Sequence, residues 1–146
     1  FFNVHLQSMH FAKDDYDFIE TIDNQGIEEV KKNGRNILKK MRNSNVQRAV
    51  QINAVKEEVL KSPYPVVLCG DFNDVPNSYA YQTINDVLKD AFITRGNGIG
   101  RTFTKLSPTL RIDFMFYSPL LITQEFKILQ LSSSDHRPLI SSFQIL

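Results

Sequence analysis

Carboxylate and amide side chains directly follow one short apolar run in the middle of the chain. Residues 65–77 read PVVLCGDFNDVPN, and the apolar first half predicts a buried strand that ends at a glycine. Asp71 and Asn73 come next, spaced to share one face. Polar groups at the carboxyl end of a buried strand are held rigidly yet face solvent, which is where α/β folds place their chemistry. Asp74 or Asn77 alone would suit a turn that caps a helix, but the pair at Asp71 and Asn73 favours a cation or phosphate site.

The first apolar segment of the chain carries a histidine. Residues FFNVHLQS alternate, so we expect Phe2, Val4 and Leu6 to face the core and His5 to lie on the opposite, polar row. A histidine in such a row is either a hydrogen-bonded group of the inner layer or a participant in catalysis. The alternation leaves both readings of His5 open.

A further carboxylate lies inside an apolar strand. Residues 111–117 read RIDFMFY and alternate again, which places Asp113 on the face opposite Ile112 and Phe114. An isolated buried carboxylate is very costly, so Asp113 must be hydrogen-bonded or paired. Arg111 is the structural candidate for its partner, and a histidine from another strand is the functional alternative.

Asp135 and His136 stand just before a closing strand that we expect over residues 139–145. Three serines, residues 132–134, precede them, and serine, aspartate and histidine are the residue types of a serine hydrolase. Nothing resembling a nucleophile elbow accompanies them, so this reaction is not favoured.

The candidate groups are mostly oxygen ligands, which bears on the metal that they would hold. Closely spaced zinc ligands such as H-E-x-x-H are missing from the sequence. Carboxylates and amides point instead to a hard cation, most simply Mg²⁺, with Mn²⁺ as the alternative. Two histidines and several carboxylates around such an ion are the groups that hydrolysis of a phosphoester needs.

Alternating helices and strands must position these groups. Ser44 and Gln47 form a capping-box pattern, which predicts a helix from Ser44 to about Lys61. Its expected buried stripe consists of Val46, Val50, Val55 and Val59. A second helix is expected over residues 79–88, with Pro76 in a first turn, and a strand over residues 123–131. The order of elements is typical of an α/β fold.

The composition describes one globular domain. The chain has 146 residues, of which 42% are hydrophobic and 23% charged, and a net charge of +1 that says nothing about nucleic acid. Its single cysteine, Cys69, excludes an intrachain disulfide. No targeting segment, membrane span or membrane contact is evident, and the compartment is not predicted. A basic run at residues 31–42 either steers a polyanionic substrate or is the solvated face of a helix.

Four blocks in one order, NVHL, GDFND, RIDFMF and SDHRPL, resemble the second half of the endonuclease/exonuclease/phosphatase superfamily, the deoxyribonuclease I-like proteins. The resemblance implies that His136 is the general base or polarises the phosphate, with Asp113 orienting it. It implies that His5 contacts the scissile phosphate or assists the leaving group, and that Asp71 and Asn73 lie at the phosphate and the attacking water. The implied metal ligands are Asp71, Asn73 and Asp135.

The same resemblance implies the fold and the activity. We expect an α/β fold that is half of a four-layer sandwich, with one mixed sheet covered by helices, and residues 1–146 as the carboxyl-terminal portion of one domain. The implied parent is a Mg²⁺-dependent phosphoester hydrolase, acting as a phosphodiesterase, nuclease or phosphatase. Its substrate class stays open between nucleic acid, nucleotide, and lipid or inositol phosphate.

The family's main metal-binding glutamate is implied to come from an earlier, amino-terminal half. Glu20, Glu28 and Glu29 follow the His5 segment, so chain order argues against assigning that role to them. We therefore expect the amino-terminal half to be a required partner, and the 146-residue chain by itself to bind Mg²⁺ weakly and to hydrolyse phosphoesters poorly. The alternative is a non-catalytic binding or scaffolding module that keeps the superfamily core.

Overall fold

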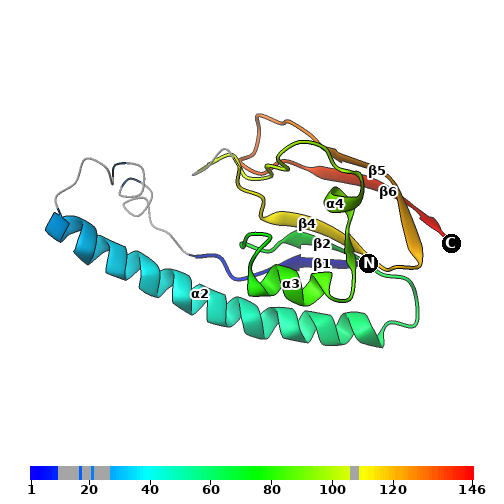
Figure 1. Cartoon of the computed structure of the whole chain (residues 1–146), viewed down its shortest axis with the longest axis horizontal. Coiled ribbons are helices and arrows are strands. Elements are labelled where there is room, and N and C mark those ends of the chain that lie inside the picture. The colour runs from blue at the N-terminus through cyan, green and yellow to red at the C-terminus, as the bar shows by residue number, and fades with distance from the viewer. Residues whose placement is uncertain (10–16, 18–20, 22–26, 106–108) are drawn as a thin grey trace.

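The computed structural model describes residues 1–9, 17, 21, 27–105 and 109–146, with the backbone only for residues 27–32 (Figure 1). Its helices and strands alternate through most of the chain, as is typical of an α/β fold, and three consecutive strands end it. In chain order they are β1 (Phe2–His5), α2 (Ile27–Lys61), β2 (Val67–Asp71), α3 (Tyr79–Asn85), β3 (Lys89–Asp90), α4 (Ala91–Arg95), β4 (Asp113–Tyr117), β5 (Leu121–Ile128) and β6 (Leu139–Ile145).

A four-stranded mixed sheet forms the centre of the fold, with strand order β1-β2-β4-β3. Strand β1 runs parallel to β2, whereas β2 and β4, and β4 and β3, pair antiparallel. The predicted mixed α/β architecture is confirmed. The expected strand at residues 66–69 is β2, and it is buried because helices cover one face and a second sheet packs against the other.

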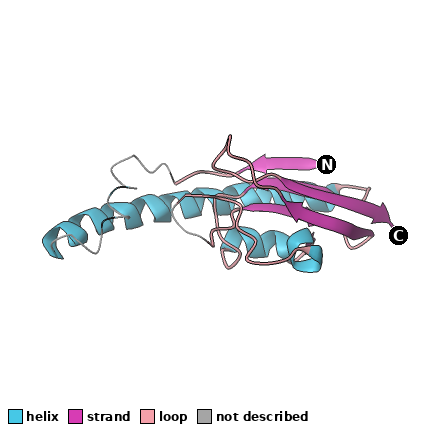
Figure 2. Cartoon of the chain, turned by 90° about the horizontal axis from the view of Figure 1, so that it is seen from above, coloured by secondary structure: helices cyan, strands magenta, loops and turns pink. Residues whose placement is uncertain are grey.

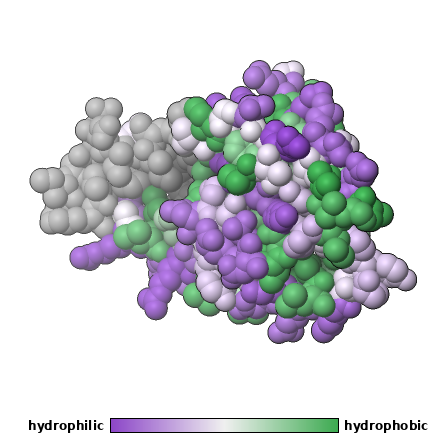
Figure 3. Space-filling model, turned by 45° about the vertical axis from the view of Figure 1, so that its right-hand side comes forward, coloured by the Kyte–Doolittle hydropathy of each residue, from purple (hydrophilic) through white to green (hydrophobic). Residues whose placement is uncertain are grey.

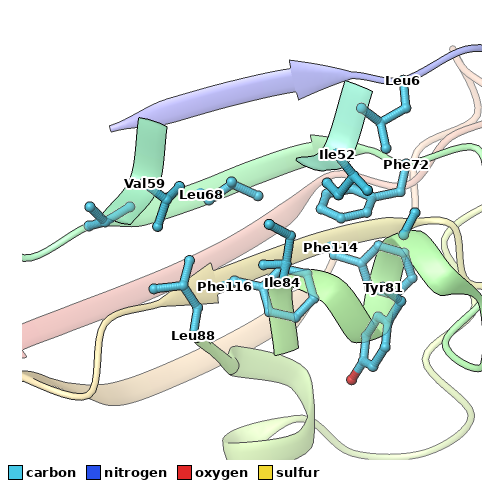
Figure 4. Close-up of a cluster of buried hydrophobic side chains, with 12 residues drawn as sticks. Leu6, Ile52, Val59, Leu68, Phe72, Tyr81, Ile84, Leu88, Phe114 and Phe116 are labelled. Atoms are coloured by element: carbon cyan, nitrogen blue, oxygen red, sulfur yellow. The ribbon is translucent and has the colours of Figure 1, made fainter. Parts of the chain in front are cut away.

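Helices α2 and α3 lie against one face of this sheet (Figures 1 and 2). The core between them is closely packed, as Figure 4 shows. Ile52 and Val59 of α2 meet Leu68 of β2 and the rings of Phe114 and Phe116 of β4. The side chains of alternate β4 residues point into this cluster, as the RIDFMFY pattern predicts.

A second, two-stranded sheet of β5 and β6 was not part of the expected single sheet. Its inner residues Leu121 and Phe126 pack with Val67 and Tyr117, which lie on the opposite side of the main sheet from α2. On the side where both termini lie, exposed apolar residues include Phe1, Leu120, Ile145 and Leu146, and hydrophobic patches are visible there in Figure 3.

The expected start of the long helix at Ser44 is wrong. Helix α2 begins at Ile27, and Ser44 lies inside it, buried, with its Oγ donating to the carbonyl of Ser8 at 3.1 Å. Gly34 does not break the helix, because the cost of one glycine, about 1 kcal/mol, is small against a helix of 35 residues.

The expected buried stripe of α2 is half wrong. Val46 and Val50 are 60% and 69% exposed, whereas Val59 is buried and Val55 is partly buried. The buried side of the described helix instead carries Ser44, Arg48, Ile52, Val55 and Val59. Two of its five positions are polar, so a pattern of apolar residues could not locate this side.

Three smaller features of the secondary structure also differ from expectation. Helix α3 is capped by the hydroxyl of Ser78 and ends at Asn85, so Pro76 lies before it and not in its first turn. The short helix α4, capped by Asp90, was not predicted. Strand β5 starts and ends a few residues earlier than residues 123–131. No helix in the described part of the chain is long and apolar enough to span a bilayer.

Candidate active site

Three adjacent strands bring three of the predicted residues to one end of the main sheet. His5 at the end of β1 is opposite Asp71 at the end of β2 in the parallel register. Asp71 is in turn opposite Asp113 at the start of β4 in the antiparallel register. The hydrogen-bonded registers of the sheet, and not a local motif, therefore set the spacing of these side chains.

Asp71 is the central acidic group of this cluster. Its Oδ1 accepts a 2.7 Å hydrogen bond from the backbone N–H of Asn73, and its Oδ2 lies 3.7 Å from Nε2 of His5 and 3.9 Å from Nε2 of His136. Burial raises the pKa of the Asp71 carboxyl; the hydrogen bond from Asn73 opposes this, and the nearby Asp113 carboxylate adds to it. Such a carboxylate gains from a positive charge close by.

Asp113 pairs with His136, the functional alternative that the sequence left open. Nδ1 of His136 lies 3.1 and 3.0 Å from the two carboxylate oxygens of Asp113. A carboxylate only accepts hydrogen bonds, so Nδ1 is the nitrogen that carries the proton and Nε2 is left free to accept one. Arg111 instead pairs with Asp90 at 2.6 Å, which excludes it as the partner of Asp113.

His136 is held by residues 102–104. The N–H of Arg137 donates to the Thr102 carbonyl at 2.7 Å, and the N–H of Thr104 donates to the Asp135 carbonyl at 2.8 Å. The His136 ring packs against Phe103, with ring centroids 4.8 Å apart. The fully buried hydroxyl of Thr102 also accepts from the N–H groups of Ile112 and Asp113 at 3.0 Å, so one residue holds both members of the Asp113–His136 pair.

Asn73 and Gly70 fit close backbone geometry beside Asp71. Asn73 has φ of 50°, a left-handed conformation that asparagine tolerates, and its Nδ2 donates to the carbonyl of Leu6 at 3.0 Å. Gly70 has φ of +148°, and a Cβ there would lie 1.8 Å from the carbonyl oxygen of Val4. Only glycine allows β1 to approach β2 this closely.

Asp135 lies apart from the other carboxylates. Its Oδ2 pairs with Nζ of Lys105 at 2.9 Å, and this hydrogen bond holds the pKa of Asp135 below its ordinary value. Among the described residues, the group able to share a cation is Asp71, Asp113 and His136, whose ligand atoms lie within 4.8 Å of one another. A metal-binding role for Asp135 stays a prediction.

A pocket of about 770 Å³ opens over this cluster. Its lining includes His5, Asp71, Asn73, Asp135 and His136, which are five of the six predicted site residues. Asp113 does not line the pocket, but its carboxylate contacts Nδ1 of His136, which does. The pocket therefore places exposed polar groups around one open space.

The sequence did not indicate that α2 forms a wall of the pocket. Met41, Asn45 and Arg48 of this helix contribute to the lining. Arg48 is 2% exposed, and it pairs with Asp74 at 3.0 Å and donates to the carbonyl of Gln7 at 2.9 Å. It thereby ties the segments after β1 and β2 to the helix. An arginine in a basic helix carries no sequence signal that separates this role from solvation.

A sequence model of the endonuclease/exonuclease/phosphatase family matches residues 13–136, which is most of the chain. The chain belongs to this family. The family takes its name from endonucleases, exonucleases and phosphatases, whose substrates are phosphoesters. No curated protein sequence matches it significantly.

Several solved structures share the fold. A family protein from Bacteroides vulgatus is 28% identical, with a TM-score of 0.54, over 71% of this chain and 45% of that one. A conserved protein of unknown function from Enterococcus faecalis has 22% identity and a TM-score of 0.63, over 70% of this chain and 46% of that one. A mannosyl-6-phosphatase from Bacteroides thetaiotaomicron has 22% identity and a TM-score of 0.53, over 70% and 46%. The chain spans less than half the length of each of these structures.

Proposed function

We propose that this chain carries most of the active site of a Mg²⁺-dependent phosphoester hydrolase. The observation that supports the proposal most directly is the Asp113–His136 contact at 3.0 Å beside the Asp71 carboxylate, at a pocket that opens to solvent. A histidine whose tautomer is set by a carboxylate, with its other nitrogen facing an open space, is the arrangement of a general base.

His136 is the proposed base for the attacking water. Its Nε2 accepts the proton of a water that attacks phosphorus from the pocket, and Asp113 stabilises the imidazolium that results. His5 is 75% exposed at the pocket, so its ring is available to donate to a phosphate oxygen or to the leaving group. Asn73 offers its side-chain amide to the same phosphate.

The donor atoms fit a divalent cation. Asp71 would hold it together with water and substrate oxygens, since Mg²⁺ is usually bound through one or two carboxylates and keeps several waters. Asp113 and His136 of the same group are engaged with each other in the proposed general-base pair, and Asn73 and Asp135 are the further ligands that the resemblance implies. A bound cation would supply positive charge for the transition state. The position of the Asp71 carboxylate next to that of Asp113 supports a cation here, because two neighbouring carboxylates gain from a positive charge between them.

The substrate is proposed only to the level of a phosphoester. The structural neighbours include a mannosyl-6-phosphatase and the human Nocturnin catalytic domain with a bound sulfate anion. These names describe those proteins. At 22% and 20% identity, the likeness shows that the fold is shared, but it does not show that the substrate is. The pocket of about 770 Å³ is larger than a phosphate group, so we expect it to hold part of the esterified alcohol as well.

A further metal ligand from residues outside this chain remains part of the proposal. The family resemblance implies a glutamate from an amino-terminal half, and the 146-residue chain by itself is therefore expected to have low activity. High Mg²⁺-dependent activity of the purified 146-residue chain would contradict this point.

The test is hydrolysis of a substrate panel by the whole protein, with DNA, RNA, nucleotides, sugar phosphates and inositol phosphates. We expect product release that requires Mg²⁺ and stops with EDTA. His136→Ala should lower turnover by about 10²–10⁴-fold. Lys127→Ala, at an exposed position of β5, is the control and should leave turnover unchanged. No hydrolysis of any phosphoester by the whole protein would favour the non-catalytic binding module.

A further inference from the structure

The outer side of α2 carries a surface that the proposed catalytic function does not use. The amino-terminal half of the helix extends past both sheets in Figures 1 and 2. Arg35, Lys39, Arg42, Val46 and Val50 follow one another at spacings of four and three residues, which aligns them along one side of a helix. We call these five residues the outer stripe.

The outer stripe faces solvent. The buried side of α2 includes Ser44 and Arg48, and Ser44 lies two residues from both Arg42 and Val46, which places it on the opposite side of the helix. The three cations of the stripe are exposed, and Val46 and Val50 are 60% and 69% exposed. In the described part of the chain, none of the three cations has an ion-pair partner.

The charge of this surface has one sign. Residues 30–56 contain eight Lys and Arg residues and no Asp or Glu, although the whole chain has a net charge of only +1. The helix surface therefore attracts anions locally where the molecule as a whole does not.

Exposed aliphatic groups distinguish the possible anionic partners. Val46 and Val50 continue the cationic stripe, and Leu38 beside it is 66% exposed. The phosphate backbone of a nucleic acid has no apolar surface for these side chains to contact. Helix α2 also has no aromatic residue on which a base could stack. A bilayer surface accepts both groups, because its headgroups bind cations while its acyl boundary takes up apolar side chains.

We propose that the outer stripe of α2 binds the surface of an anionic lipid membrane. The segment lies on the surface and does not span it. The sequence pattern indicated no membrane contact; what the structure adds is that Val46 and Val50 lie outside the core and in line with the cations. The inference is independent of the hydrolase activity, because it requires neither a metal nor a substrate.

Sedimentation with lipid vesicles tests this inference on the full chain. We expect binding to phosphatidylcholine vesicles that contain phosphatidylserine and little binding to phosphatidylcholine vesicles without it. Binding should weaken when salt rises from about 0.15 M to about 1 M, since the Debye length falls from about 8 Å to about 3 Å. Each cation near an anionic surface is worth about fivefold in partitioning, so Arg35→Glu/Lys39→Glu/Arg42→Glu should reduce binding by at least about 100-fold.

A matched triple variant controls for net charge. Lys61→Glu/Lys89→Glu/Lys127→Glu makes the same change in charge at exposed positions away from the stripe and should keep most of the binding. Val46→Asn/Val50→Asn keeps the charge and should weaken binding several-fold. Circular dichroism should show the same helical content in all variants.

Four results would overturn the proposal. These are no binding of the unmodified chain to phosphatidylserine vesicles, equal loss of binding in the two triple variants, unchanged binding of Val46→Asn/Val50→Asn, and binding of an RNA or DNA oligonucleotide through the stripe in place of vesicles. The last result would assign the surface to nucleic acid.

Discussion

Asp113 acts, in the proposed mechanism, only through His136. Its carboxylate lies 3.0 Å from Nδ1 of the imidazole and does not line the pocket. A group of this kind sets the tautomer and the direction of the ring, and its contribution disappears when the ring is removed.

We therefore predict that the effects of Asp113→Asn and His136→Ala on turnover are not additive. Asp113→Asn should lower kcat by about 10²–10⁴-fold, as loss of general-base catalysis does. In the His136→Ala background the same change should cost less than about tenfold, because the two residues act as a unit. The measurement is kcat for the four members of the cycle in the whole protein. Independent, multiplying effects would show that Asp113 has a separate role.

Tyr81 provides a pH-dependent prediction away from the candidate active site. Its hydroxyl donates to Asp90 at 2.8 Å, and burial together with the Asp90 carboxylate raises the pKa of Tyr81 from 10.0 to about 12. Below pH 10 the tyrosine is protonated in both the folded and the unfolded chain. Between pH 10 and about 12 the unfolded chain loses this proton while the folded chain keeps it, so the stabilisation by Tyr81 is lost as pH rises through this window.

Tyr81→Phe should remove this pH dependence. At neutral pH the variant loses the hydrogen bond to Asp90 and should be less stable by about 1–2 kcal/mol. Urea unfolding at pH 8 and at a pH just above 11 measures the difference, and the two proteins should become closer in stability at the higher pH. A gap that stays constant would contradict the raised pKa.

At this scale the sequence predicted the residues that adjoin regular strands. His5 and Asp71 end strands of the main sheet and Asp113 begins one, and the structure brings them together with His136. The structural role of Arg48 could not be predicted from the sequence, because its partners lie 26 and 41 positions away in the chain. The same holds for Asp135. Its ion pair with Lys105, 30 positions away in the chain, is known only from the three-dimensional structure.

Helix α2 is the element in which sequence and structure differ most. A capping-box pattern at Ser44 normally marks a helix start, but here the hydroxyl bonds to the Ser8 carbonyl from the middle of the helix. The valine pattern failed for a related reason, because the helix buries Ser44 and Arg48 against the segments that carry the site. Polar residues that serve the site interrupt the apolar periodicity on which helix faces are predicted.

Arg48→Ala should be strongly destabilising. Removal of the guanidinium takes the cation away from the Asp74 carboxylate, which is only 17% exposed, and also removes the hydrogen bond to the Gln7 carbonyl. This should cost about 3 kcal/mol. Lys56→Ala is the matched control on the same helix, because its 3.8 Å pair with the exposed Asp86 is a surface ion pair worth less than about 1 kcal/mol. Urea unfolding of both variants measures the difference. Equal losses would show that Arg48 is not a structural tie between α2 and the site.

The whole molecule consists of helices, a four-stranded sheet and a two-stranded sheet in packed layers. The sequence predicted the α/β class and the central strands, but not the division of the strands into two sheets. That division depends on which strands pair over long distances in the chain, and alternation of residues carries no such information.

Binding of a cation to the folded chain should stabilise the molecule as a whole. If Asp71 holds Mg²⁺ as proposed, a concentration ten times Kd should stabilise the fold by about 1.4 kcal/mol and raise Tm by a few degrees. Asp71→Asn keeps an acceptor for the Asn73 N–H but removes the carboxylate, and its Tm should not respond. Thermal unfolding with Mg²⁺ and with Na⁺ at equal ionic strength measures the effect. An equal rise for both proteins would place the cation elsewhere.

The segment that carries His136 connects β5 and β6 of the two-stranded sheet and contacts the four-stranded sheet through Asp113. Asp113 belongs to the four-stranded sheet, whereas His136 lies between β5 and β6 of the other. A shift of one sheet relative to the other would change the contacts of the His136 ring with Asp113 and Phe103. The chain has only 3 histidines, so the imidazole resonance of His136 can be resolved in a proton NMR spectrum. The chemical shift of that resonance would therefore serve as a measure of movement between the two sheets, without substrate and without an added label.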